Sequence, residues 1–512
     1  MNIAQNLELA CYLFPNKPAL IFEEQCLTYK DLDEMVNRVA NGLRSLGIRR
    51  RDRVVLFLPN IPEFVISYLG ILKIGAVVVS INVMLKTDEV RYILNDCAAK
   101  AIITTEPQTE YIQEADLPEL QHILIAEGRA NNNISLTQLM AKFSPEARAV
   151  EMTHDAPASI LYTSGTTGFP KGATLSHGNV IFNSYGANCC YRIQKSDRLL
   201  LFLPLSHCFG QNAIMNAGIS ACSTIILQRR FDPEQVLKTI TTHQVTMLFG
   251  VPTVFIKLLN MDTSNYNLKN IRYYFSAAAP MPLQVAENWY TKYGLVIHEG
   301  YGLTETSPFA TYNHNLKYKL GSVGTPIANV EMKIVDGDDN QVKIGELGEI
   351  VIKGSNVMLG YWNRPFETAE VLKNGWLHTG DIGRMDEDGF FYIVDRLKDM
   401  IVVSGFKVYP TEIENVIYQH PGVAEVAVYG VPDPLKNETV KANIIPKTGH
   451  TITEQQIIDF CYEKMAAYKV PRVINFVNSI PKNSTGKVLK RVLSQESISN
   501  FAEKRQELGV RS

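Results

Sequence analysis

A loop rich in glycine and threonine, with one lysine, is the strongest chemical signal in the chain. It has the sequence YTSGTTGFPKG, from Tyr162 to Gly172, and follows the strand-like residues ASILY. Glycines let backbone amides approach an anion closely, hydroxyls donate hydrogen bonds, and Lys171 adds a positive charge. The spacing GxxGxxK differs from the Walker A pattern, because Gly172 occupies the Ser or Thr position. The loop therefore predicts a phosphate-binding site of another kind; a plain surface turn is the alternative.

A single carboxylate follows a second glycine-rich segment. Glu305 lies in EGYGLTETS, residues 299–307, after the strand-like LVIH. Magnesium in proteins is usually held by one or two carboxylates together with substrate phosphates, which makes Glu305 a candidate metal ligand. Another carboxylate, Asp381, ends the turn-like HTGD and is suited to accept hydrogen bonds from a ribose. An ordinary turn aspartate is the alternative there.

Two further residues combine a reactive side chain with an unusual setting. His207 lies between apolar residues in PLSHCFG, as either a hydrogen-bonded core histidine or a group that orients a substrate. Lys487 follows Gly486 in PKNSTGKVLKR, so a lysine on a glycine hinge could reach a developing anion. A solvated basic loop is the alternative for this segment.

The elements that must position these residues alternate along the chain. Hydrophobic periodicity predicts helices at 31–46, 62–75 and 87–96, and strands at 54–58, 76–81 and 101–104. This rhythm implies a parallel sheet with helices on its faces. The apolar run 64–85 has Lys73 as its only formal charge, but Pro62 and Gly75 divide it into a helix and a strand. We therefore predict no transmembrane segment.

In the rest of the chain, the pattern of predicted helices and strands changes twice. A second βα series runs from about 158 to 295, and short strands separated by Gly, Asp and Asn turns predict a β-rich region at 321–393. A small α/β unit begins near Asp395, with strands at 424–431 and 473–477 around a helix at 454–467. The predicted fold class is α/β: a large N-terminal domain of two packed βα subdomains plus a β-rich subdomain, and a small C-terminal α/β domain.

Composition excludes several classes of protein. The chain has 512 residues, 46% of them apolar and 20% charged, which is ordinary for a globular protein of more than one domain. With 50 Lys and Arg against 52 Asp and Glu, the net charge is −2, so no field of one sign is present to gather nucleic acid or an anionic membrane. Eight scattered cysteines without a CxxC pair argue against a disulfide framework or structural zinc. The N-terminus has no basic residue before its apolar stretch, which favours the cytoplasm over secretion.

Five segments together resemble one family. YTSGTTGFPKG, EGYGLTETS, HTGD, DRLKDMIVVSGFKVYPTEIE (395–414) and PKNSTGK resemble, in this order, the motifs of the adenylate-forming enzymes: acyl-CoA synthetases, luciferases and the adenylation domains of peptide synthetases. The resemblance implies an AMP-binding N-terminal domain at 1–396 and a small domain at 397–512 that rotates about a hinge near Lys398. It also implies two half-reactions. A carboxylic acid and MgATP first give an acyl-adenylate and pyrophosphate, and a thiol then takes the acyl group as AMP leaves.

The resemblance assigns roles to individual residues of this chain. The implied catalytic residues are Lys487, His207, Glu305 and Thr304. The implied phosphate loop consists of Thr163, Ser164, Gly165, Thr166, Thr167, Gly168 and Lys171. Mg²⁺ would be held by Glu305 and Thr163, and adenosine by Ala278, Ala279, Tyr301, Asp381 and Arg396. Lys398 would be the hinge residue, and Gly405 would leave room for the pantetheine arm of CoA.

Three residues that are typical of particular relatives are missing from this chain, and their absence narrows the range of acids that the resemblance implies as substrate. Relatives that adenylate amino acids carry an Asp in an FDxS-like segment, and here PLSHCFG has no acidic residue. Acetate-using relatives have Trp where Gly302 stands, so a longer acyl group is expected. Plant-type 4-coumarate:CoA ligases usually have Cys where Val351 stands. We therefore expect a medium- or long-chain fatty acid as substrate and CoA as acceptor.

Other hypotheses stay open at this point. A stand-alone ligase that loads an acyl carrier protein, an aryl or hydroxycinnamate:CoA ligase, and a luciferase-like oxidase share these motifs. A nucleotide-binding regulatory descendant would be expected to lose Lys487, Glu305 or Asp381, and all three are present. Ala277 stands where many relatives have Gly and adds a methyl group beside the acyl or nucleotide site. A homodimer is compatible with the sequence, which does not reveal an oligomer interface.

Overall fold

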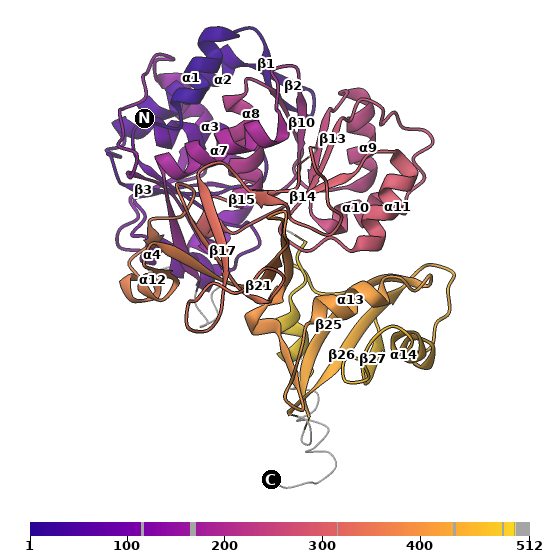
Figure 1. The fold of residues 1–512 in the computed structure, drawn as a ribbon. Coiled ribbons are helices and arrows are strands. Elements are labelled where there is room, and N and C mark those ends of the chain that lie inside the picture. The colour runs from indigo at the N-terminus through magenta and orange to yellow at the C-terminus, as the bar shows by residue number, and fades with distance from the viewer. Residues whose placement is uncertain are drawn as a thin grey trace.

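A large N-terminal part and a smaller C-terminal part make up the molecule (Figure 1). The structure, a computed structural model, describes residues 1–113, 117–163, 170–314, 316–433, 437–483, 486–495 and 497. The small part, orange to yellow in Figure 1, lies below the large part and joins it beside β21. Within the described residues the strands form four sheets.

The first sheet carries the strand that leads into the phosphate loop. In spatial order it contains β19 (Gly360–Tyr361), β9 (Lys171–Ser176), β8 (Pro157–Thr163), β4 (Val77–Ser80), β3 (Arg53–Phe57), β5 (Ala101–Thr105), β6 (His122–Glu127) and β7 (Ile134–Ser135). Its strands are parallel from β8 to β7, whereas β9 and β19 are antiparallel additions at one edge. Both faces are buried: Val54 and Leu56 belong to the main core, and Val55 and Phe57 to a second cluster with α4.

The second sheet carries the nucleotide-site motif around Tyr301. Its order is β16 (Thr325–Pro326), β15 (Phe309–Tyr312), β14 (Ile297–Gly302), β13 (Tyr273–Ser276), β12 (Met247–Gly250), β10 (Arg198–Leu201), β11 (Thr224–Leu227), β1 (Pro18–Phe22) and β2 (Gln25–Thr28). Its centre, from β14 to β1, is parallel. Both predicted βα series are therefore present as sheets.

Helices cover these sheets. The α-helices of the N-terminal part are α1 (Gln5–Leu13), α2 (Tyr29–Ser45), α3 (Pro62–Lys73), α4 (Thr87–Asp96), α5 (Glu110–Gln113), α6 (Leu136–Lys142), α7 (His177–Tyr191), α8 (Ala217–Ser220), α9 (Pro233–Thr242), α10 (Pro252–Leu259), α11 (Leu283–Tyr293) and α12 (Pro365–Val371). Shorter turns are the 3₁₀ segments η1 (Pro107–Thr109), η3 (Thr304–Thr306) and η4 (Leu397–Asp399) and the π-helix η2 (Phe209–Asn216).

The apolar run 64–85 forms the buried helix α3 followed by strand β4, as predicted. Lys73 at the end of α3 is fully buried, and its ammonium lies 2.8 Å from Asp33 and 3.0 Å from Glu8. A buried charge persists only when it is paired, so the lysine joins α3 to α1 and α2. In the described part of the chain, no helix combines the length and apolarity needed to span a bilayer.

The β-rich subdomain and the C-terminal part each contain a five-stranded sheet. The former consists of β17 (Val330–Val335), β18 (Gly348–Gly354), β21 (Trp376–Met385), β20 (Leu372–Lys373) and β22 (Phe391–Arg396). The latter consists of β24 (Phe406–Val408), β23 (Ile401–Val403), β26 (Asn437–Pro446), β25 (Val423–Asp433) and β27 (Val473–Phe476), with helices α13 (Pro410–Ile417) and α14 (Glu454–Tyr462). The α/β class and the arrangement into subdomains are confirmed.

The two parts have separate hydrophobic cores. The main core ends at Phe391, and the C-terminal core begins at Ile401 and ends at Ile474. The interval between them contains Lys398, the predicted hinge. This separation supports a division near residue 396, which remains a prediction.

Two sequence predictions were wrong in detail. HTGD is not a turn: His378–Asp381 lies inside strand β21, where Gly380 has φ +70° and the register with β18 shifts. A bulge, which needs an extra residue in an unusual conformation, produces the same Gly-Asp signal as a turn. The helix predicted at 454–467 ends at Tyr462 as α14.

Candidate active site

Three of the motifs meet at a buried carboxylate. Tyr301 lies near the end of β14, Asp381 lies in β21, and Arg396 is the residue opposite Asp381 in β22. The Tyr301 hydroxyl donates to Asp381 Oδ2 at 2.7 Å, and Arg396 Nε lies 3.2 Å from Oδ1. Asp381 is 4% exposed, so its charge is stabilised by these two partners. The pairing fixes an acceptor beside an aromatic ring, which suits a nucleoside.

The lysine of the last motif enters the same region. A Cβ on Gly486 would lie 2.8 Å from Thr253 Oγ1 and 3.0 Å from Val251 Cγ2, so this loop of the C-terminal part packs on the start of α10. Burial and, to a smaller extent, the charge of Arg396 together lower the pKa of Lys487 to about 8, against the opposite effect of Asp381. The segment is therefore packed against the large part rather than solvated.

His207 lies between β10 and η2 and stays uncharged. Burial and, to a smaller extent, the nearby charge of Lys487 lower its pKa to about 4. The backbone N–H of Phe209 donates to His207 Nδ1 at 3.2 Å, so the neutral ring carries its proton on Nε2. The next residue, Cys208, donates from Sγ to Thr304 Oγ1 at 3.6 Å and joins this loop to η3. His207 can thus donate a hydrogen bond to a carboxylate without adding charge.

The phosphate loop connects two antiparallel strands. Thr163 ends β8 and is opposite Lys171, the first residue of β9; the Thr163 hydroxyl donates to the Lys171 carbonyl at 3.4 Å. The predicted ligands between them, Ser164, Gly165, Thr166, Thr167 and Gly168, lie outside the described residues. Because a strand follows the loop, any anion there is held by loop amides and side chains rather than by the start of a helix.

Glu305 lies in η3 beside this hairpin. Tyr361 donates from its hydroxyl to Glu305 Oε1 at 2.8 Å. Among the residues described, no cluster of three His, Cys, Asp or Glu side chains could hold a metal without help. The predicted ligands, one carboxylate and the Thr163 hydroxyl, are oxygen donors of the kind that hold Mg²⁺ in proteins together with substrate phosphates and water.

The loop after β13 contains the predicted adenine contacts. Ala278 has φ +72°, a left-handed conformation that costs a residue with a Cβ about 1 kcal/mol. Ala279 and Pro280 follow it. This loop lies over Glu299, whose carboxylate is bound by the backbone N–H of Met281.

Glu299 is a residue that sequence reasoning missed. It is 6% exposed and lies two residues before Tyr301 on the same face of β14. Its Oε1 has no hydrogen-bond partner among the residues that the structure describes. Burial raises its pKa to about 8, although the Met281 bond opposes the shift. Nothing in the local sequence signalled this, because a partner of its carboxylate, the backbone N–H of Met281, lies in a separate loop of the chain.

Glu299→Gln is expected to change the pH dependence of stability. The folded-state pKa, about 8, is above the ordinary value of 4.5, so the carboxyl's contribution to stability is complete below 4.5 and is lost as pH rises through 8. E299Q cannot titrate. Its thermal midpoint should match that of the wild type near pH 5 and exceed it near pH 9. The difference near pH 9 corresponds to a free energy of unfolding that is higher in the variant by on the order of a few kcal/mol. Scanning calorimetry with the exposed control Glu287→Gln tests this; equal midpoints near pH 9 would contradict it.

Gly405 is the one described site residue that lies apart from these groups. Ser404 and Gly405 form the two-residue turn between β23 and β24, with φ values of 49° and 86°. Two positive φ values are typical of a type I′ turn, which explains the glycine. A Cβ on Gly405 would have no heavy atom within 4 Å, so the turn is open to solvent.

The backbone around position 302 gives a structural reason for the glycine found there. A Cβ there would lie 1.7 Å from the Pro308 carbonyl oxygen, at the register shift between β14 and β15. The backbone therefore requires glycine whatever the length of the acid. The substrate argument based on Gly302 is correspondingly weaker.

Known proteins resemble this chain over almost its whole length. The AMP-binding enzyme family matches residues 7–362, and the AMP-binding enzyme C-terminal domain matches 412–487. A long-chain-fatty-acid–CoA ligase of Escherichia coli O6:H1 is 36% identical, covering 94% of this chain and 92% of that protein. A feruloyl-CoA synthase of an Amycolatopsis species is 35% identical, covering 93% and 95%. The crystal structure of an anthranilate CoA ligase with anthranoyl-AMP has a TM-score of 0.92 at 31% identity, covering 97% of each chain.

The chain belongs to the AMP-binding, adenylate-forming enzyme family. It is an acid–CoA ligase of the AMP-forming type. The resemblance inferred from five motifs is thereby confirmed at the level of family and reaction class.

Proposed function

We propose that the enzyme activates a medium- or long-chain fatty acid with ATP and transfers the acyl group to CoA. The observation that carries the proposal is the 36% identity to a long-chain-fatty-acid–CoA ligase across nearly the entire chain. In the first step the carboxylate attacks the α-phosphate, giving the acyl-adenylate and pyrophosphate. In the second step, the CoA thiolate attacks the acyl carbon and AMP leaves. AMP is a good leaving group, whereas the oxygen of a free carboxylate is a poor one.

The residues gathered in the site divide between the two substrates. Thr163, Ser164, Gly165, Thr166, Thr167, Gly168 and Lys171 would bind the β- and γ-phosphates. Tyr301, Ala278, Ala279, Asp381 and Arg396 would bind adenosine. Lys487 would neutralise the α-phosphate as charge develops, and the Nε2–H of His207 would orient the acid. Glu305, with Thr163, would hold Mg²⁺, which supplies charge neutralisation to the phosphates when bound; Thr304 positions this turn beside Cys208.

Domain rotation would connect the two steps. We assign residues 1–396 to the AMP-binding domain and 397–512 to the rotating domain, with Lys398 of η4 as the hinge. Burial, reinforced by Arg396, lowers the pKa of Lys398. In this orientation Lys487 is inside the site and the Gly405 turn is outside it, which is the arrangement expected for adenylation.

An aromatic cluster beside His207 supports an apolar acyl group. Phe275 lies 6.0 Å from Phe209 and 5.4 Å from Phe309 between ring centroids, and a Cβ on Gly300 would meet Phe275 Cζ at 2.5 Å. Such rings pack favourably against hydrocarbon. Aryl acids fit the same rings, and the similarity to a feruloyl-CoA synthase and an anthranilate CoA ligase makes an aryl acid the second candidate.

Pyrophosphate release across a panel of acids tests the proposal. The panel contains fatty acids of increasing length, hydroxycinnamates, benzoates and amino acids, each assayed with CoA and with an acyl carrier protein. We expect the highest kcat/KM with a medium- or long-chain fatty acid and CoA. Faster turnover of a hydroxycinnamate or of an amino acid would overturn the proposed substrate. Faster transfer to the carrier protein than to CoA would overturn the proposed acceptor.

A further inference from the structure

Tyr361 lies between the phosphate loop and the carboxylate proposed to bind the metal. Its strand, β19, adds two residues to the edge of the first sheet, with Tyr361 opposite Ala173 in β9. Main-chain bonds from Leu359 N to the Thr174 carbonyl (2.9 Å) and from Trp362 N to the Gly172 carbonyl (2.7 Å) extend the pairing. The segment is thus fixed to the strand that begins with Lys171.

The same segment binds Glu305 at two points. The Tyr361 hydroxyl donates to Glu305 Oε1 at 2.8 Å, and the backbone N–H of Met358 donates to the Glu305 carbonyl at 2.8 Å. In this pair the tyrosine hydroxyl is the donor, because a carboxylate oxygen accepts. A donor to a carboxylate fixes the rotation of that carboxylate.

The ring of Tyr361 also contacts Lys171. The lysine Nζ lies 5.5 Å from the ring centroid, within the range of a cation–π interaction. One side chain therefore contacts both charged groups, with its hydroxyl on the carboxylate and its face toward the ammonium.

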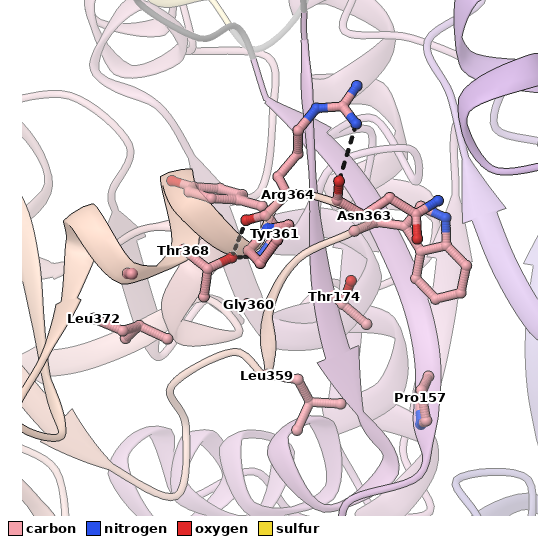
Figure 2. A pocket seen from close by; sticks show the side chains of 12 residues that line it. Pro157, Thr174, Leu359, Gly360, Tyr361, Asn363, Arg364, Thr368 and Leu372 are labelled. Carbon is pink, nitrogen blue, oxygen red and sulfur yellow. Dashed lines mark hydrogen bonds between the residues drawn. The ribbon is translucent and has the colours of Figure 1, made fainter.

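Neighbouring residues hold Tyr361 in place. Thr368 Oγ1 of α12 accepts from the Tyr361 backbone N–H at 2.9 Å and donates to the Arg364 carbonyl at 2.7 Å, as the dashed lines in Figure 2 show. Arg364 in turn pairs with Asp96 of α4 at 2.6 Å. Thr368 and Arg364 line, together with Tyr361, an open pocket of about 600 Å³.

We infer that Tyr361 is a positioning residue for MgATP, orienting the Glu305 carboxylate for the metal and holding Lys171 for the phosphates. The inference rests on the proposed roles of these two residues. The hydroxyl is hydrogen-bonded to Oε1, so Oε2 is the oxygen of Glu305 that the Tyr361 contact leaves available and that would face the metal. The hydroxyl should therefore affect the contribution of the metal, and the ring should affect the contribution of the lysine.

Calorimetric titration with ATP, without acid, tests the inference. Each protein is titrated once with saturating Mg²⁺ and once with EDTA, and the ratio of the two affinities measures how much the metal strengthens ATP binding. Tyr361→Phe keeps the ring, so it should reduce this ratio by about tenfold and leave the affinity in EDTA unchanged. Tyr361→Leu should also lower the affinity for ATP in EDTA, because Lys171 loses its cation–π contact with the tyrosine ring.

Tyr392→Phe is the matched control. Tyr392 donates to Asp386 Oδ2 at 3.1 Å in the β-rich subdomain, so Y392F removes the same kind of bond away from the site and should leave the ratio unchanged. A wild-type ratio in Y361F, or an equal loss of affinity with Mg²⁺ and with EDTA, would overturn the inference. Glu305→Gln distinguishes failure of the proposed metal ligand from failure of the inference about Tyr361. If E305Q keeps the wild-type ratio, the proposed metal ligand and this inference both fail; if E305Q loses it and Y361F does not, only the inference about Tyr361 fails.

Discussion

Lys487→Ala should lower ATP–pyrophosphate exchange by about 100-fold or more, because a preorganised positive group at a developing charge contributes that much. Lys487 is the charged residue that the C-terminal part inserts beside Asp381 and Arg396. In the proposed mechanism it acts only while the α-phosphate reacts. Transfer of the acyl group from a pre-formed acyl-adenylate to CoA should therefore stay close to the wild-type rate, and the two assays together identify the step.

Lys482→Ala is the control for this variant. Lys482 lies in the same loop but pairs with Glu425 at 2.5 Å within the C-terminal part. K482A removes a lysine charge from the loop and should keep normal exchange. Full exchange in K487A would show that the lysine has no role in adenylation, and loss of both half-reactions would show that the substitution acts through folding.

Gly405→Leu should have the opposite effect, sparing exchange and lowering thioester formation by about 100-fold, the cost of displacing reacting groups by a small distance. The turn is exposed in the present orientation, and an added Cβ has no heavy atom of the described residues within 4 Å, so a larger side chain should be tolerated while the adenylate forms. If rotation brings this turn to the CoA path, the leucine blocks the pantetheine arm. Single-turnover transfer from acyl-adenylate to CoA measures the effect.

Backbone strain must be separated from that blockage. Leucine at φ +86° costs about 1–2 kcal/mol wherever it is placed. Gly389→Leu is a matched control, since Gly389 has φ +79° in the turn between β21 and β22 and no heavy atom within 4 Å of an added Cβ. Thermal midpoints of the two variants should fall together, but only G405L should lose thioester formation. Equal transfer rates in both would contradict the assigned role of Gly405.

The fold was predictable where burial repeats with the period of the element. The helix predicted at 87–96 is α4, with the same bounds, because its apolar residues recur on one face. Helix 454–467 was predicted too long. Good helix formers follow Tyr462, but the chain turns there, so that Met465 and Val470 pack on the C-terminal core. Tertiary packing overrides local propensity at such ends.

The site was predictable where a motif is local and not where contacts are distant. Tyr301, Asp381 and Lys487 lie in short segments of unusual composition. Tyr361 is 56 residues from Glu305 and lies in no such segment, so only the pairing of β19 with β9 shows its position. Glu299 is within a motif, but its unpartnered oxygen depends on the loop packed over it.

The position of Lys487 has a thermodynamic consequence. Its lowered pKa, about 8, means that holding the charged ammonium in a site without a bound anion costs a few kcal/mol. A polyphosphate reduces that cost when it binds, so it favours the docked orientation of the C-terminal part. By reciprocity the docked part favours the polyphosphate by the same factor. The C-terminal part and the nucleotide would thus bind the large part cooperatively. In the proposed mechanism, departure of pyrophosphate would weaken the docking that the proposed rotation has to undo.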